Sequence, residues 1–413
     1  MTKDEILDAA LRAWGRDYFK KTSLSDLSAE LGVTKAALYR HFPSKAALVS
    51  ALESRFFDEY ARRLVESPLS ARGDDEQAGE IIHFVYDLQL PPFAEDKDLF
   101  SFFFYHILHG PASFGRIATE LEGRGIPIER THPRLGGEGA ALGFAYLTGM
   151  FALSVAYMQE GRSEGLPRLT GAEALVAARE VTRRGLALAA DPPCDYPALE
   201  AIAALSPGEA GPDQPLLEAV AQAVAQAGLR NATMDMVAAR AGLSKSGLYA
   251  HFRSREEALG SMFAVEFDRI SRLGGERASR ASSPAAKVFL SMATTANYLR
   301  ARPDILGVMR WLFARRIDVR LELPKRIAED AAFLLREAAA GRCSLIGGSL
   351  DLSLRWMHYL VVDLVLREMA TGEPAPPNAA EDLRALHRLV IGGIGRECRI
   401  AGAGPPGRRA GIE

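Results

Sequence analysis

The fold of this chain is decided by the stretch Ser23-Leu-Ser-Asp-Leu-Ser-Ala-Glu-Leu-Gly-Val-Thr-Lys-Ala-Ala-Leu-Tyr-Arg-His-Phe-Pro-Ser-Lys45. Ser23 and Thr34 each precede a short apolar-periodic segment, and a hydroxyl side chain at that place caps the first turn of a helix. Gly32 lies between the segments, where glycine takes the left-handed conformation that ends a helix at no steric cost. The spacing therefore predicts two short helices, 24–31 and 35–42, joined by a tight turn.

The same stretch returns 210 residues later as residues 233–255. When residues 5–45 are set over 215–255 without a gap, 11 of the 41 pairs are identical, and 8 of these lie in the last 17 positions. A period of this length is far too long for a solenoid repeat and has the length of a whole domain or subunit. The chain is therefore interpreted as two related subunits in tandem.

Apolar residues recur at three- and four-residue spacing along 6–14 and along 216–224, which predicts an amphipathic helix before each pair of short helices. Pro43-Ser44 breaks the chain before a long helix, and Ser254-x-x-Glu257 in the second copy has the capping-box pattern. This order of helices and glycine turn is typical of a helix-turn-helix unit. We call each such unit, together with the long helix that follows it, a head.

Both heads resemble the tetracycline-repressor (TetR) family of bacterial transcription regulators, on the residues Ser23–Lys45 and Thr233–Arg255. The resemblance implies that the short helix after the glycine lies in the major groove of DNA. It also implies that the side chains around this helix contact bases and phosphates. The implied DNA-binding residues are Ser23, Thr34, Lys35, Ala36, Ala37, Tyr39, Arg40, His41 and Lys45 in the first head, and Thr233, Ser244, Lys245, Ser246, Gly247, Tyr249, His251 and Arg255 in the second.

Each of these residues alone has a simpler explanation, because a Tyr-x-His pair on a short helix usually packs and a single lysine is usually a solvated charge. The repeated set favours DNA binding. Residues 5–45 carry seven basic and five acidic side chains and 215–255 carry five and two, although the whole chain has 50 Lys+Arg and 52 Asp+Glu. One alternative stays open: a ligand-binding or interaction protein whose heads no longer bind DNA, because Ala250 stands opposite Arg40.

Catalytic and metal-ligating patterns are not persuasive in this sequence. The segment Gly242–Gly247 lacks the preceding strand and the spacing of a phosphate-binding loop, and His106-x-x-His109 lacks a nearby carboxylate pair, so ordinary packing explains it better. Three cysteines at unrelated spacings suit neither a zinc site nor a disulfide framework, which favours a reducing cytoplasm: Cys194, Cys343 and Cys398. We expect no enzymatic activity, no cofactor and no metal.

The expected fold class is all-α, because no strand-like alternation of useful length occurs and the chain of 413 residues is 48% hydrophobic. Gly139–Met158 is free of charge and imitates a membrane span, but its counterpart Ser349–Leu366 carries three charged side chains. We interpret both as buried helices. The N-terminal Met-Thr-Lys-Asp-Glu leaves no room for a signal peptide, so we expect a cytoplasmic bacterial protein with no membrane partner.

By resemblance, each head is followed by a helical effector-binding domain whose last two long helices form a dimer interface. Helices at 139–158 with 172–189, and at 349–366 with 381–395, stand where that interface belongs. A Pro/Gly-rich segment separates the two halves. The expected division is a first head at 1–62, a first effector domain at 63–190, a linker at 191–213, a second head at 214–272, a second effector domain at 273–400 and a disordered tail at 401–413.

The aromatic run Phe100–His106 exceeds what one core face needs, so part of it is a candidate lining for a ligand cavity, with core packing as the competing interpretation. The second half offers Met309, Trp311 and Phe313 at the corresponding place. Candidate ligand-binding residues are Phe102, Phe103, Tyr105, His106, Tyr146, Met150, Trp311 and Trp356.

These observations favour a site-specific DNA-binding regulator. The expected form is a repressor that a small-molecule effector releases from DNA. Because Arg40 and Ala250 differ, the double-stranded DNA operator is expected to be an imperfect palindrome. Both heads are on one chain, so the two halves are expected to pair within it, and the protein is expected to be a monomer that acts as an intramolecular pseudo-dimer.

Overall fold

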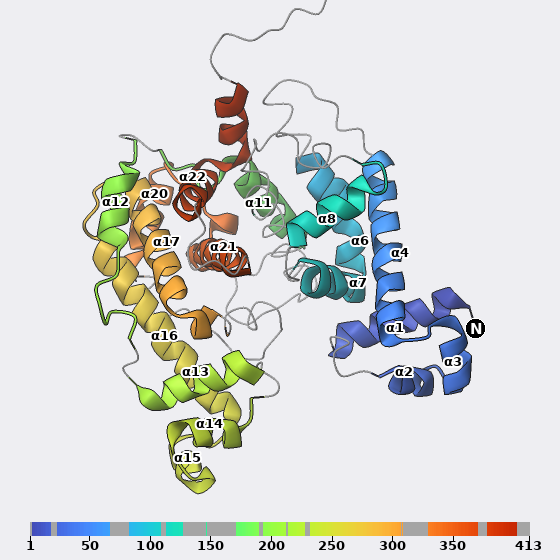
Figure 1. Cartoon of the computed structure of the whole chain (residues 1–413). Helices are drawn as coiled ribbons and strands as arrows, with labels where there is room; N and C mark the ends of the chain where they lie inside the picture. The colour runs from blue at the N-terminus through green and yellow to red at the C-terminus, as the bar shows by residue number, and fades with distance from the viewer. Residues whose placement is uncertain are drawn as a thin grey trace, which may run out of the picture. The chain divides into compact units, whose positions relative to one another are not determined.

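In the computed structural model of the chain, the residues that the structure describes are 2–17, 23–66, 82–108, 113–126, 146, 171–189, 193–211, 214–227, 232–306, 308, 329–370 and 378–402. Every regular element within these ranges is a helix (Figure 1), which confirms the all-α expectation. The elements form two compact units. Unit 1 runs through the helices of the first half as far as Arg179, and unit 2 contains the described residues from Glu180 to Glu397.

The head of unit 1 consists of α1 (Lys3–Asp17), α2 (Leu24–Glu30), α3 (Lys35–His41) and α4 (Lys45–Glu66), the four blue helices of Figure 1. Helix α1 packs on both α2 and α4, and α2 packs on α3. Apolar side chains from all four helices are buried between them, as their periodicity predicts: Ile6, Ala9, Ala10, Leu24, Leu27, Leu38, Leu48 and Leu52.

The rest of unit 1 is a short-helix core against which the head rests. Its elements are the π-helix η1 (Phe84–Gln89), α6 (Leu90–Glu95), α7 (Lys97–Phe102), the π-helix η2 (Phe103–Leu108), α8 (Ser113–Glu122) and the part of α11 (Gly171–Arg184) that precedes Glu180. Helix α7 packs along α1, and α8 packs on α4. The head of unit 1 is therefore joined to its core mainly through α1 and α4.

Unit 2 repeats this plan with longer helices. Its head is α13 (Pro215–Ala227), α14 (Met234–Ala241), α15 (Lys245–His251) and α16 (Arg255–Ala278). The core that follows has α17 (Pro284–Ala301), α20 (Ala332–Ala339), the 3-10 helix η4 (Ile346–Gly348), α21 (Leu350–Ala370) and α22 (Ala379–Gly402). Helix α17 lies between α16 and α21 and buries most of its length, so it is the centre of this unit.

The segment expected to be a linker is partly folded. It contains α12 (Tyr196–Ala203), which packs on α17 and α16 and buries Leu199 and Ala203. Asp195 caps this helix by accepting a hydrogen bond from the Ala198 amide at 3.3 Å. The Pro/Gly-rich part that follows is not helical, but buried arginines of unit 2 donate to its carbonyl oxygens at Ala204, Ala210 and Gly211. Composition indicated the break in helix correctly, but it carried no information about these long-range contacts.

The closing helix of the first half is shorter than expected. Helix α11 ends at Arg184, because Gly185 adopts a left-handed conformation with φ of 58°. The next residues run beside α22, where Leu186 donates a backbone hydrogen bond to the Val390 carbonyl at 2.7 Å and Leu188 donates one to Ile391 at 3.0 Å. The carbonyls of Val390 and Ile391 can accept hydrogen bonds from residues outside α22, because this helix is broken at Gly393, whose φ is 64°.

Of the uncharged segment at 139–158, the structure describes only Tyr146, so the interface expected there lies outside the described residues. Its counterpart, expected at 349–366, is α21. Among the helices that the structure describes, none is long and apolar enough to cross a membrane.

Candidate nucleic-acid interface

The short helix α3 is held at both ends by the residues that the sequence singled out. The hydroxyl of Thr34 accepts a hydrogen bond from the Ala37 amide at 3.2 Å, and Gly32 makes the preceding turn with φ of 65°. Phe42 follows the helix in an extended conformation and is buried. Local hydrogen bonds thus fix where α3 begins and ends.

Helix α15 in the second head is built the same way. Ser244 accepts from the Gly247 amide at 3.0 Å, and Gly242 turns with φ of 67°. The long helix behind it begins at Ser254, which accepts from the Glu257 amide at 3.1 Å. The expected capping box is only half formed, because the Glu257 carboxylate accepts from the Arg253 amide rather than from that of Ser254.

One side of each short helix is buried and the other is open. Leu38 and Leu248 are fully buried, as predicted for residues that face the three-helix core. Tyr39 and Tyr249 are 48% and 45% exposed although both are aromatic. The remaining candidates on the two helices are exposed or half-buried: Thr34, Lys35, Ala36, Ala37, Arg40 and His41, with Ser244, Lys245, Ser246, Gly247 and His251.

The hydroxyl candidates at the starts of α2 and α14 are already used as caps. Ser23 accepts from the Asp26 amide at 3.1 Å and donates to the Asp26 carboxylate at 2.7 Å. That side-chain bond and the bond from the Ser23 amide to the same carboxylate lower the pKa of Asp26. Thr233 accepts from the Met236 amide at 3.2 Å. Ser23 would have to exchange its side-chain partner to donate to a phosphate.

The basic candidates that open the two long helices are only half-exposed. Burial lowers the pKa of Lys45, and the charge of Asp26 partly offsets that effect. At the corresponding place Arg255 pairs with Glu256 at 3.0 Å.

The two heads differ at their matching lysines. Lys245 on α15 forms an ion pair with Asp235 on α14 at 2.9 Å, and the hydrogen bond that Lys245 donates to this carboxylate raises the pKa of Lys245. Position 25, the counterpart of Asp235, is a serine, and Lys35 makes no ion pair among the residues that the structure describes. The second head therefore presents a lysine charge that is already partly neutralised.

The ligand-binding candidates of the first half divide into those inside one aromatic cluster and those outside the described residues. Phe102 and Phe103 are buried and lie within 6.1 Å and 5.3 Å of the Phe56 ring on α4. His106 contacts the carboxylate of Glu53. Tyr146 is buried, the side chain of Tyr105 is not described, and Met150 lies outside the described residues.

Only one ligand-binding candidate of the second half lies within the described residues. Trp356 is buried in α21 of unit 2, and Trp311 lies outside the described residues. No group of three or more residues arranged to hold a metal ion is found in the described ranges.

A cavity of about 260 Å³ lies in unit 1 at the junction between head and core. Of its lining residues only Phe102 is a candidate from the sequence, because the cavity is formed by helices that are distant in the chain. The lining consists of Leu11 on α1, Leu52, Arg55, Phe56, Glu59, Tyr60 and Arg63 on α4, Phe93 on α6, and Leu99 and Phe102 on α7.

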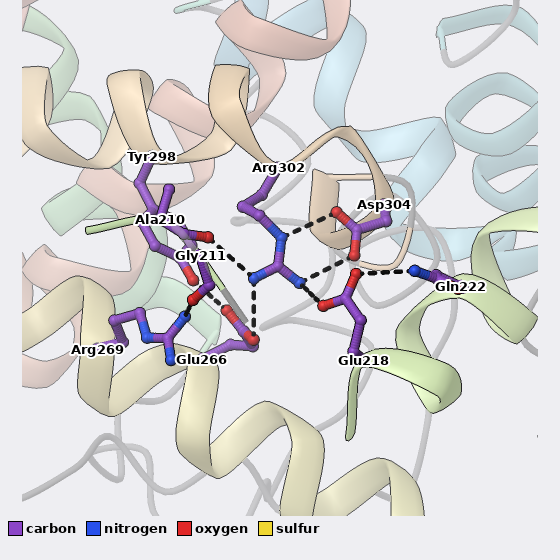
Figure 2. Close-up of polar contacts among 9 residues, drawn as sticks. All are labelled: Ala210, Gly211, Glu218, Gln222, Glu266, Arg269, Tyr298, Arg302 and Asp304. Atoms are coloured by element: carbon purple, nitrogen blue, oxygen red, sulfur yellow. Dashed lines mark hydrogen bonds and ion pairs between the residues drawn. The ribbon is translucent and has the colours of Figure 1, made fainter. Parts of the chain in front are cut away.

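At the equivalent junction of unit 2 the structure has a cluster of charged groups (Figure 2). Arg302, which is 6% exposed, donates to Asp304 at 2.9 Å and to Glu218 on α13 at 2.6 Å, and its guanidinium lies 3.5 Å from Glu266 on α16. Tyr298 donates to the other oxygen of Glu266. The cluster thus ties both long helices of the second head to the end of α17.

The electrostatics of this cluster follow from burial and pairing. Burial by itself would lower the pKa of Arg302, but the hydrogen bonds and charges of Asp304 and Glu266 raise it above its ordinary value. Burial would also raise the pKa of Asp304, yet Arg302 holds it below its usual value. For Glu218, burial is the larger effect and its pKa is raised.

Comparison with known proteins shows that both heads are similar to one family. The family model described as bacterial regulatory proteins, tetR family, matches residues 6–52 and again residues 216–261. Similar curated proteins are the HTH-type transcriptional regulator TtgR and the probable HTH-type transcriptional regulator ArpR, both of Pseudomonas putida. Each is 43% identical over 51 residues, which is 12% of this chain and only 24% of the length of the relative.

A similar solved structure is the TetR family transcriptional regulator PfmR from Thermus thermophilus. It is 24% identical, and the similarity covers 43% of this chain and 97% of PfmR at a TM-score of 0.32.

Proposed function

Because both heads belong to the tetR family of bacterial regulatory proteins, we propose that the chain is a two-headed, site-specific DNA-binding transcriptional regulator. The observation that carries this proposal is the duplicated open surface of α3 and α15. Both helices expose a tyrosine and a lysine on the side away from the core, at matching positions. Lysine, tyrosine and hydroxyl side chains are the usual donors to DNA phosphates.

The small residues on these helices support a close approach to bases. Ala36 and Ala37 in α3, with Ser246 and Gly247 in α15, leave the start of each helix without bulk. Arg40 can donate a bidentate pair to guanine, and the second head has Ala250 at that position. We infer an operator with two related but unequal half-sites.

The regulator is proposed to be a repressor that a small molecule releases. A ligand that favours one arrangement of a head over another weakens operator binding by the same factor by which DNA weakens ligand binding. We further propose that the two halves pair within one chain, since tethering raises their effective concentration to about the millimolar range. Such a protein acts on the bacterial nucleoid in the cytoplasm.

The test is operator selection from a random double-stranded DNA pool, followed by fluorescence anisotropy with the selected duplex at several salt concentrations. Lys35→Ala should weaken binding and reduce the salt slope by about one. Lys245→Ala should have the smaller effect, because Asp235 already neutralises that lysine. Arg336→Ala on α20 is the matched control, an exposed arginine outside both heads, and should change neither quantity.

The Asp235→Ser variant sharpens this test, because serine is the residue that the first head has at position 25. Freeing Lys245 should raise DNA affinity about two- to five-fold, the range expected for one exposed ion pair. If no duplex is selected, or if all these variants bind alike, the rival function is favoured: a ligand-binding or interaction protein whose heads do not read DNA.

A further inference from the structure

The cavity at the head–core junction of unit 1 has walls that suit a flat aromatic molecule. The Phe56 ring is stacked with Tyr60 at 5.8 Å and 16°, and with Phe103 at 5.3 Å and 22°. Phe93 and Phe102 complete an aromatic wall, with ring centroids 6.2 Å and 6.1 Å from that of Phe56. Offset stacking on such faces stabilises a planar ring more than an aliphatic chain.

The charged groups at this cavity are already paired. Arg55 contacts Asp8 on α1 at 2.8 Å, and Arg63 contacts Glu59 at 2.7 Å. A charged ligand would have to displace one of these pairs, so the cavity favours an uncharged molecule. The Tyr60 hydroxyl makes no hydrogen bond within the part of the chain that the structure describes, and burial raises its pKa. It stays protonated and can bond one polar group on the ligand.

The volume sets the size of the ligand. An engineered apolar cavity of about 150 Å³ holds benzene. The cavity here is about 260 Å³, which corresponds to two fused rings with a small substituent. The cavity found in unit 2, between α16, α17, α20 and α21, is about 40 Å³ and has room for water alone.

The second junction differs by substitutions that the repeat makes visible. Position 56 corresponds to 266 and position 59 to 269, so Phe56 and Glu59 of unit 1 are Glu266 and Arg269 in unit 2. Arg302 joins Glu266 to Glu218 on α13, and Arg269 donates to the Gly211 carbonyl (Figure 2). A buried network of this kind has one set of partners and resists rearrangement, whereas an apolar cavity can open and close.

We propose that the first junction binds one uncharged, two-ring aromatic molecule per chain, and that this ligand acts on the first head alone while the Arg302 cluster holds the second head fixed. The role of the ligand in regulation rests on the proposed DNA-binding function, but its binding does not. The ligand would contact α1 and α4 of the head and α6 and α7 of the core together. It would therefore change the stability of their packing.

The experiment is calorimetric titration of the full chain with 2-naphthol, which has two fused rings and one hydroxyl, in the absence of DNA. One molecule should bind per chain. Leu99→Trp on α7 fills the cavity and should weaken binding at least about ten-fold. The control Val65→Trp, at a position on α4 that is 67% exposed, should leave it unchanged.

Tyr60→Phe keeps the ring and removes the hydroxyl, so the variant does not depend on a large change in packing. It should weaken 2-naphthol about three- to ten-fold, the range of one neutral hydrogen bond, and leave naphthalene unchanged. Hydrogen exchange should then show slower exchange in α1 and α4 with 2-naphthol bound, and no change in α13 and α16.

Three results would overturn the proposal: no binding up to the solubility of 2-naphthol, two molecules per chain, or equal protection of both heads. Because none of these assays contains DNA, failure here leaves the DNA-binding function untouched. Failure to select an operator would equally leave this site standing.

Discussion

Replacing Arg302 with methionine removes the one cation that three carboxylates of unit 2 share. Methionine fills most of the space of the arginine stem, so the loss is one of charge rather than of volume. Asp304, Glu218 and Glu266 would then remain 18%, 19% and 8% exposed without a common partner. The Tyr298 hydroxyl would still donate to Glu266, and Gln222 would still donate to Glu218 at 3.0 Å.

The magnitude follows from this burial. Removing one partner from a buried ion pair costs about 3–5 kcal/mol, because the remaining charge stays desolvated. The loss should be largest at neutral pH. Arg302 holds the pKa of Asp304 below its ordinary value of 3.8, so the stability from this pair is present above that pH and is lost as the pH falls through the folded-state pKa. The difference in stability between the Arg302→Met variant and the unchanged protein should therefore become smaller in the same acidic range.

Native-state hydrogen exchange is the assay, because it reports the opening of each helix separately when two units need not unfold together. For the slowest-exchanging amides of α16 and α17, the free energy of opening should fall by about 3–5 kcal/mol. Arg342→Met is the control, since Arg342 pairs with Glu337 at 2.8 Å while its side chain is 63% exposed, and it should leave the exchange of these amides unchanged. A loss below about 1 kcal/mol in α16 and α17 would show that the cluster does not hold the second head and refute the reasoning.

Four further outcomes are expected. Arg40→Ala should relax base preference by about 1–3 kcal/mol in one half-site only, and equal loss in both half-sites in a binding selection would contradict unequal heads. Gly242→Ala should destabilise the protein by about 1 kcal/mol, because φ is 67° at this position. Gly260→Ala lies within α16, where an added Cβ meets no other atom, and should stabilise the protein slightly. Urea unfolding measures both changes. Hydrogen bonds from Arg62 and Arg63 lower the pKa of Glu59 to about 2. The stability that Glu59 contributes is therefore fully present above pH 4.5, the ordinary pKa of this group, and is lost as the pH falls toward 2. A carbon-13 NMR midpoint for Glu59 near its ordinary value would exclude those bonds. Light scattering should give 44.8 kDa in solution, and twice that mass, persisting on DNA, would rule out intramolecular pairing.

The heads could be predicted from the sequence because their signals are local. Thr34 and Ser244 each bond an amide three residues away, and Gly32 and Gly242 each make a turn that few other residues can adopt. Nothing distant is needed to place such helices. The expected helix at 35–42 therefore differs from α3 by one residue at its end, and the same signals in the repeat give α15 the same length as α3.

The junctions could not be predicted because they depend on long-range contacts. Phe56 and Phe93 are separated by helices of the same unit, and no periodicity relates them. In the sequence Arg302 resembles any solvated charge, and its bond to Glu218 spans 84 positions. One local clue does exist in the long helices that end the two heads, since a phenylalanine in one copy stands opposite a glutamate in the other at positions 56 and 266.

The short non-helical segment after α11 determines where the chain can be divided without breaking a folded unit. Leu186 and Leu188 donate to the broken turn of α22, and Leu186 also accepts from the Ser344 amide at 2.8 Å. These residues lie before the second repeat begins, yet they belong to the compact unit that the repeat forms. A fragment starting at residue 190 would carry the complete second copy of the duplicated sequence and still leave the carbonyls at Val390 and Ile391 without those donors. The second repeat in the sequence therefore begins later than the folded unit 2. Dividing the chain where the second repeat starts would not give a complete folded unit.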